Sequence, residues 1–240
     1  MCGRFTLDTT AFDLAQQFKV EVNESISSRY NIAPSQSILI IKQNEKNQRF
    51  LDLVKWGLVP SWVKSLDTWK SNLINARVET VEEKPSFRDG FKKRPCLIPV
   101  SGFYEWSKDK QPYYFYQDKP LFARLTKYPY PKVYPLGQRG EPPQRIFALA
   151  GIWETWSNLE TEEKLLSCTI LTSEAKSAIA EVHHRMPVII PSEYYDLWLG
   201  ELDGRKELIE SLPEIELQMY QVSKTVNSPK NDSSDCIKPL

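Results

Sequence analysis

Histidine and cysteine are scarce in this sequence of 240 residues, and the few that occur are not arranged as metal ligands. Only two histidines are present, His183 and His184, and the four cysteines at positions 2, 96, 168 and 236 form no Cys-x-x-Cys pair. A structural zinc site needs a close cluster of such ligands, so we expect no metal. Four scattered cysteines also argue against a disulfide framework and fit reduced thiols in a cytosol or nucleoid.

Long apolar runs and net charge are missing too. No run approaches the length of a membrane span, and no apolar signal segment follows Met1, so we expect a soluble, cytoplasmic protein with no membrane partner. Lys+Arg and Asp+Glu both number 31, which excludes a globally basic nucleic-acid binder but not a local basic patch. Residues 1–100 carry 15 basic and 11 acidic residues, whereas residues 193–216 carry two basic and eight acidic ones. A polyanion is therefore expected to meet the first half of the chain.

Short apolar segments fill the middle of the chain and predict strands, whereas helical patterns stand at the start and in the last third. The predicted strands are 37–41 with a partner near 50–54, 96–100, 103–106, 113–117, 146–153 and 167–172, and the predicted helices are about 10–18, 173–182, 193–199 and 205–212. Asp8 or Thr9 is expected to cap the first helix, with Phe12 on its apolar face, and Ser173 to cap the second. Because helices and strands do not alternate regularly, the pattern favours an α+β fold.

The chain is predicted to form a single domain over residues 1–226. Residues 227–240 are polar and are expected to pack on the domain or to fray from it. Residues 128–144 hold five prolines and are expected to form a long surface loop.

Cys2 follows the initiator Met1 directly. If Met1 is removed, Cys2 carries a free α-amine, with a pKa of about 7.7–8.0, next to its thiol. Such an amine condenses with an aldehyde to a Schiff base, and the thiol can then close on the imine carbon to give a thiazolidine. From position alone, Cys2 is equally an arbitrary residue of a fraying terminus.

Seven further motifs stand in order along the chain. They are RYNIAPSQ (29–36), WGLVPSW (56–62), INARVET (74–80), CLIPVSGFYEW (96–106), LAGIWETW (149–156), TILTSEA (169–175) and VHHRMPVI (182–189). With the MCGRF start, this set resembles the SOS response-associated peptidase (SRAP) family of abasic-site processing proteins. The sequence departs from that pattern at Val63, where some relatives have a second aromatic residue, at His184, where an acidic residue is usual, and in the loop 128–144.

The resemblance implies a curved, barrel-like antiparallel core flanked by helices. It implies a protein that acts as a monomer on single-stranded DNA, needs no cofactor, and forms a thiazolidine crosslink between Cys2 and the opened sugar of an abasic site. Removal of its own Met1 and some β-lyase activity are also implied, and in a bacterium the protein would be associated with the nucleoid.

Four residues match the family's catalytic set. These are Cys2 as nucleophile, Asn75 near the Cys2 amine or the sugar, and Glu105 and His183 as acid/base groups. Schiff-base formation must move protons and expel water, which a carboxylate and an imidazole can serve, while an amide fixes geometry without titrating. Without the resemblance, Glu105 could face solvent on an edge strand, Asn75 could belong to a turn, and His183 could be a core residue.

A second set of residues is predicted to bind DNA. Arg4, Arg77 and Arg185 each lie two residues from a catalytic candidate, where they could clamp a phosphate, with Arg77 and Arg4 favoured over Arg185. Trp62 could stack on a base or belong to the core. Gly3 would let the DNA backbone approach Cys2 closely.

Two other functions remain open at this point. Glutamine amidotransferases of the N-terminal-nucleophile class also begin Met-Cys-Gly, and glutaminase activity without a DNA crosslink would favour that class. A non-catalytic single-stranded DNA-binding module would bind reversibly and would not need Cys2.

Overall fold

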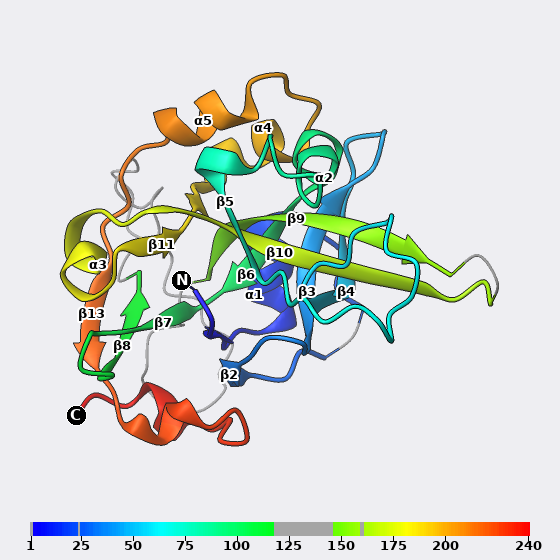
Figure 1. Ribbon diagram of the computed structural model, residues 1–240. Coiled ribbons are helices and arrows are strands. Elements are labelled where there is room, and N and C mark those ends of the chain that lie inside the picture. The colour runs from blue at the N-terminus through cyan, green and yellow to red at the C-terminus, as the bar shows by residue number, and fades with distance from the viewer. Residues whose placement is uncertain (1, 24, 118–145, 159–160) are drawn as a thin grey trace.

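Five strands close into a barrel at the centre of the molecule (Figure 1). The computed structural model describes residues 2–23, 25–117, 146–158 and 161–240, so the predicted loop 128–144 lies outside the described residues. The barrel strands are β3 (Ser37–Gln43), β4 (Arg49–Trp56), β6 (Pro95–Val100), β9 (Phe147–Ser157) and β10 (Lys164–Glu174). β3 pairs with β4 and β6, β9 pairs with β6 and β10, and β10 pairs with β4 to complete the ring.

One pairing of the barrel departs from the expected antiparallel core. β10 runs parallel to β4, with Ser167 opposite Lys55 and Cys168 opposite Trp56. The other pairings of the ring are antiparallel. The barrel interior is apolar, which explains why these strands read as continuous hydrophobic runs.

A second, five-stranded sheet lies beside the barrel and carries the start of the chain. Its order is β13 (Gln218–Gln221), β8 (Pro112–Tyr116), β7 (Gly102–Trp106), β1 (Phe5–Leu7) and β2 (Arg29–Ile32), and every pairing in it is antiparallel. Phe5 of β1 packs on Trp56 of the barrel, with ring centroids 5.1 Å apart. This contact joins the two sheets through one apolar core.

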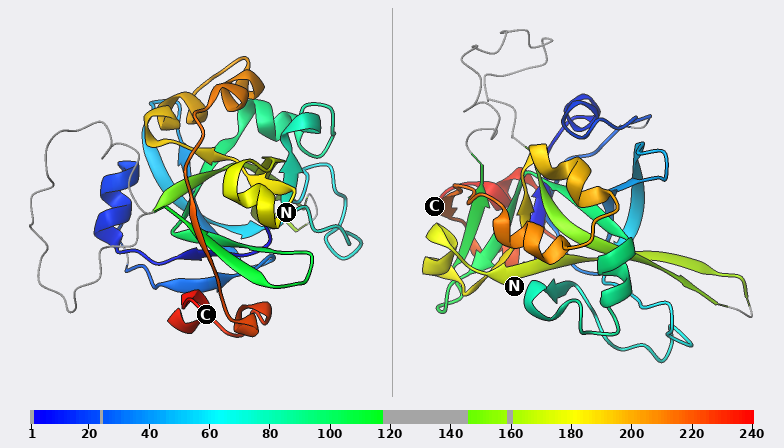
Figure 2. Two further views of the ribbon diagram at one scale, coloured as in Figure 1. Left: turned by 90° about the vertical axis from the view of Figure 1, so that its left-hand side faces the viewer. Right: turned by 90° about the horizontal axis from the view of Figure 1, so that it is seen from above.

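Shorter elements extend both sheets and cover them. β5 (Asn75–Arg77) pairs in parallel with β10. β11 (Arg185–Pro187) pairs antiparallel with β10, and β12 (Ile189–Ile190) pairs antiparallel with β9. The α-helices are α1 (Ala11–Phe18), α2 (Arg88–Lys93), α3 (Ser177–Val182), α4 (Tyr195–Leu199) and α5 (Arg205–Ser211), and 3-10 turns span Val78–Thr80, Ser192–Tyr194, Lys224–Asn227 and Ser234–Ile237. Figures 1 and 2 show α4 and α5 at one end of the molecule and the C-terminal segment at the other.

The predicted strands and most helices are confirmed, but three details of the helices were wrong. Thr10, not Asp8 or Thr9, caps α1, because its hydroxyl accepts a hydrogen bond from the backbone N–H of Asp13; Phe12 is 65% exposed and lies off the apolar face. α3 begins at Ser177 because β10 continues to Glu174, where it still pairs with β11. Ser173, which was predicted to cap this helix, therefore lies in β10 and pairs with Met186 of β11.

Gly102 lies where β7 passes close to the buried Tyr114 ring. A Cβ at this position would lie 2.4 Å from Tyr114 Cζ and 2.6 Å from the backbone oxygen of Phe115. We therefore expect Gly102→Ala to lower the free energy of unfolding by about 3 kcal/mol, as for overpacking that cannot relax. Gly90→Ala is the control, since its Cβ would make only contacts of 3.5 Å or more and alanine favours the helix α2. Urea unfolding measures both, and equal stabilities of the two variants would contradict the prediction.

Candidate active site

Four separate elements place the predicted catalytic residues around the start of the chain. Cys2 precedes β1, Asn75 begins β5, Glu105 lies on β7, and His183 follows α3. β1 is held between β2 and β7, and the backbone N–H of Tyr104 donates to the carbonyl of Arg4 over 2.9 Å. The first residues are therefore fixed by strand pairing instead of fraying.

Cys2 is completely buried. The side-chain amide of Asn75 donates to the carbonyl oxygen of Cys2 over 2.9 Å. Burial, followed by the charge of Glu105, raises the pKa of the Cys2 thiol well above its ordinary value, so the thiol is neutral at physiological pH. The Asn75 Oδ1 atom is buried and accepts no hydrogen bond from the described residues, which leaves an acceptor beside Cys2.

Glu105 is a buried carboxyl group, only 2% exposed. β7 lies between β8 and β1, so the edge-strand alternative is excluded. Strand alternation explains the position: Tyr104 and Trp106 join a separate aromatic cluster on one face, and Glu105 points to the other. Burial raises the pKa of Glu105 to about 7, which suits an acid/base group near neutral pH.

His183 faces Glu105, with its Nδ1 atom 3.9 Å from Glu105 Oε2. The same Nδ1 lies 3.0 Å from both the backbone nitrogen and the backbone oxygen of Arg185, so it accepts from the N–H in one ring tautomer and donates to the carbonyl in the other. Burial lowers the pKa of His183. His184 is exposed, and its ring lies over that of His183 with centroids 4.5 Å apart; the charge of His183 is the main cause that lowers the pKa of His184.

Two of the three arginines predicted to clamp phosphate are engaged inside the protein. Arg185 is 6% exposed and forms a bidentate ion pair with Glu79, with N–O distances of 2.7 and 2.9 Å. Arg4 donates to Asn31 Oδ1 over 2.6 Å and to the carbonyl oxygen of Val226 over 2.7 Å. Spacing along the sequence does not show which way a guanidinium group points. Arg185 is withdrawn from solvent, whereas Arg4 is half-buried, and its phosphate contact stays a prediction.

Arg77 and Trp62 face solvent, as a DNA contact requires. Arg77 is exposed at the end of β5, two residues from Asn75. Trp62 is 57% exposed and meets the edge of Trp69 with ring centroids 5.7 Å apart. Gly3, between Cys2 and Arg4, is half-buried.

Asn31 is the polar residue at this end of the molecule that the sequence reasoning missed. It is fully buried in β2 and binds both Arg4 and the C-terminal segment. A lone asparagine inside a short strand was the available signal, but its partners in the C-terminal segment lie about 200 positions away and cannot be read from the sequence.

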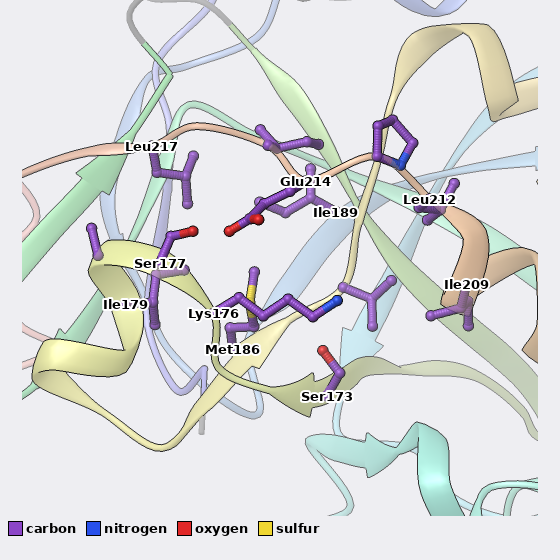
Figure 3. A pocket seen from close by; sticks show the side chains of 14 residues that line it. Ser173, Lys176, Ser177, Ile179, Met186, Ile189, Ile209, Leu212, Glu214 and Leu217 are labelled. Atoms are coloured by element: carbon purple, nitrogen blue, oxygen red, sulfur yellow. The ribbon is translucent and has the colours of Figure 1, made fainter.

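No ion or membrane segment is indicated by the described residues. Among them, no group of three or more His, Cys, Asp or Glu side chains could hold a metal. No helix in the described part of the chain is long and apolar enough to cross a bilayer. One pocket lies between α3 and residues 209–217 (Figure 3). None of the four catalytic candidates lines it.

Comparisons with known proteins give one consistent result. Residues 1–229 match the family model described as SOS response associated peptidase (SRAP). The chain is 35% identical to the abasic site processing protein YoqW of Bacillus subtilis over 99% of both chains, and 30% identical to the abasic site processing protein HMCES of Pongo abelii over 83% of this chain and 60% of that one. The fold is similar to a crystal structure of a protein from Bacteroides thetaiotaomicron, with a TM-score of 0.78 and 23% identity over the whole of both chains.

The raised pKa of Glu105 predicts a pH-dependent stability. Between its ordinary value of 4.5 and about 7, the native state holds a proton that the unfolded state releases, so this group's stabilising effect is lost as pH rises through that window. Glu105→Gln has no such proton. We compare the unfolding free energy of Glu105→Gln with that of the wild type. The difference, variant minus wild type, should increase by on the order of 2–3 kcal/mol between about pH 5 and about pH 8.

Urea unfolding at both pH values measures this difference. Glu181→Gln, which changes an exposed glutamate of α3, is the control for the loss of one carboxylate. A difference between Glu105→Gln and wild type that stays constant with pH would show that Glu105 keeps an ordinary pKa.

Proposed function

The chain belongs to the SOS response-associated peptidase family, and from this membership and the surroundings of Cys2 we propose that it is an abasic-site processing protein that crosslinks to single-stranded DNA through Cys2. The observation that carries the proposal is the setting of Cys2. Asn75 binds its backbone, and a buried carboxyl group with a pKa of about 7 lies on the adjacent strand. Such a setting serves a reaction in which an amine and a thiol must both lose protons near neutral pH.

The proposed reaction begins with the removal of Met1, which frees the α-amine of Cys2. The amine nitrogen attacks the aldehyde carbon of the ring-opened sugar and forms a carbinolamine, which loses water to give the imine. The thiol sulfur then bonds to the imine carbon while its proton passes to the nitrogen, which closes the thiazolidine. The net change is the loss of one water, with no oxidation or reduction.

Glu105 and His183 are the proposed proton carriers. Glu105, with a pKa of about 7, can take a proton from the amine or the neutral thiol and deliver one to the departing hydroxyl. His183, neutral at physiological pH, can serve the sugar oxygen during ring opening. Asn75 holds the Cys2 carbonyl and offers its buried Oδ1 to the amine. The same groups are proposed to remove Met1 and to support a β-lyase reaction.

Three residues are proposed to contact the DNA. Arg77 is proposed to contact a phosphate, Trp62 to stack on a base, and Gly3 to admit the backbone next to Cys2. We further propose that the protein acts as a monomer in the cytoplasm, at the nucleoid if the source is bacterial, and needs no cofactor.

Incubation of the purified protein with abasic single-stranded DNA, followed by a denaturing gel, tests the proposal. Wild-type protein should lack Met1 by intact-mass measurement and should form a denaturant-resistant adduct, because a blocked amine cannot make the imine. Cys2→Ala should form none, whereas Cys168→Ala, which removes a thiol enclosed in the barrel, should still react. An equal adduct from Cys2→Ala would contradict the thiazolidine, and glutamine hydrolysis without an adduct would favour an amidotransferase.

The two adjacent histidines give a matched pair of variants. His183 faces Glu105, whereas the His184 ring is exposed. We expect His183→Ala to change the rate of crosslink formation or reversal by about 10²-fold, the usual effect of a lost acid/base group, and His184→Ala to leave both rates near wild type. A preformed crosslink chased with excess abasic DNA that carries a different fluorophore measures reversal. A defect in His184→Ala alone would show that the acid/base role belongs to His184 and not to His183.

A further inference from the structure

The C-terminal residues 224–232, here called the strap, pass beneath the sheet that carries Cys2 and Glu105. Figures 1 and 2 show this segment beside β2, on the far side of the molecule from α4 and α5. Val226 is fully buried and packs in a cluster with Tyr104 and Cys236. The predicted polar tail is thus a packed part of the domain.

Arg4 connects the strap to the start of the chain. Its guanidinium group donates to the carbonyl oxygen of Val226 over 2.7 Å and lies 3.4 Å from that of Asn227. Arg4 is half-buried, and this burial lowers the pKa of its guanidinium group. Arg4 lies two residues from Cys2, so these bonds act on the short segment between Cys2 and β1.

Asn31 and Asp232 hold the strap against β2. The Asn31 side-chain nitrogen lies within hydrogen-bond distance of the carbonyl oxygens of Val226, Ser228 and Asn231, at 2.6 to 3.1 Å. The Asp232 carboxylate accepts from the backbone N–H of Asn31 over 2.8 Å and pairs with the Arg29 side chain over 2.5 Å. A buried asparagine with this many partners ties three points of the strap to one position.

Trp106 connects the strap to the other side of the site. Its indole N–H donates to Asn227 Oδ1 over 2.8 Å, and the Arg4 guanidinium lies 6.0 Å from its ring centroid. Trp106 is the immediate neighbour of Glu105 on β7. Val226 and Asn227 therefore bind Arg4, two residues from Cys2, and Asn227 also binds Trp106, the neighbour of Glu105.

We propose that the strap is a positioning element, which through Arg4 and Trp106 fixes Cys2 and Glu105 relative to each other. A free chain terminus frays unless it is tied down, and the strap adds side-chain bonds at Arg4, where the backbone bond from Tyr104 begins the pairing of β1. Reaction rates depend on such placement, because a displacement of about 1 Å can cost about 10²-fold. The consequence for crosslinking rests on the proposed function, whereas the ordering of residues 2–5 does not.

Two variants release the strap from the site without removing a candidate catalytic group. Arg4→Lys keeps the positive charge but removes the planar guanidinium group that contacts two strap carbonyls. Asn227→Ala removes the side chain that binds Trp106, at an exposed position. Lys238→Ala is the control, since it breaks only an exposed ion pair with Asp235 farther along the tail. At saturating abasic DNA and well below the melting temperature, we expect single-turnover crosslinking to slow about tenfold in Arg4→Lys and about threefold in Asn227→Ala, and to be unchanged in Lys238→Ala.

Two further readouts separate positioning from stability and from affinity. The pH profile of crosslinking should shift in both strap variants, because Glu105 is placed differently, while binding of undamaged single-stranded DNA stays at the wild-type level in Asn227→Ala. Hydrogen exchange without DNA should show faster exchange at residues 3–5 and 103–106 in both variants and unchanged exchange in β9 and β10.

The outcomes are distinct. Wild-type crosslinking rates, pH profiles and exchange in both strap variants would overturn the proposal. A lower melting temperature with unchanged rates and local exchange would also overturn it, in favour of a purely structural strap. If the wild type itself forms no crosslink, the proposed function fails, and hydrogen exchange alone still decides whether the strap orders residues 2–5.

Discussion

The pairing of β1 between β2 and β7 is the constraint on which the candidate site depends. It gives the first residues two strand neighbours, so Cys2 enters the interior at a fixed point close to a chain end. The same pairing brings Glu105, on the neighbouring strand, to the face where Cys2 is buried. Phe5 then packs on Trp56 of the barrel, which ties this small sheet to the main core.

Burial has opposite chemical effects on the groups it brings together. It raises the pKa of the Cys2 thiol until the thiol is neutral, raises that of Glu105 to about 7, and lowers that of His183. In this site the cysteine is a neutral thiol, whereas the catalytic cysteine of a cysteine protease is a thiolate. Its reactivity depends on proton transfer at the moment of bond formation, and that is the task for which a carboxyl group poised near neutrality is suited.

The sequence predicted the strands well because their apolar runs are long and uniform, and the family motifs predicted which residues gather around Cys2. The structure brings Asn75 to the Cys2 carbonyl and His183 to Glu105 from elements far apart in the chain; the catalytic roles themselves stay predictions. Where the sequence failed, the deciding contact was long-range. Spacing alone presents Arg185 as a surface phosphate ligand, but Glu79 binds its guanidinium group and the side chain is buried. The closure of the barrel by the parallel pairing of β4 and β10 has no local signal at all.

The order in which the parts of the site leave the ribosome follows from their positions. Cys2 emerges first, Asn75, Glu105 and His183 follow in turn, and the strap that binds Arg4 comes last. The strands that pair with β1 are complete by Trp106, whereas the strap that binds Arg4 is made more than 100 residues later. The last contacts at the start of the chain can therefore form only when synthesis of the domain is almost finished.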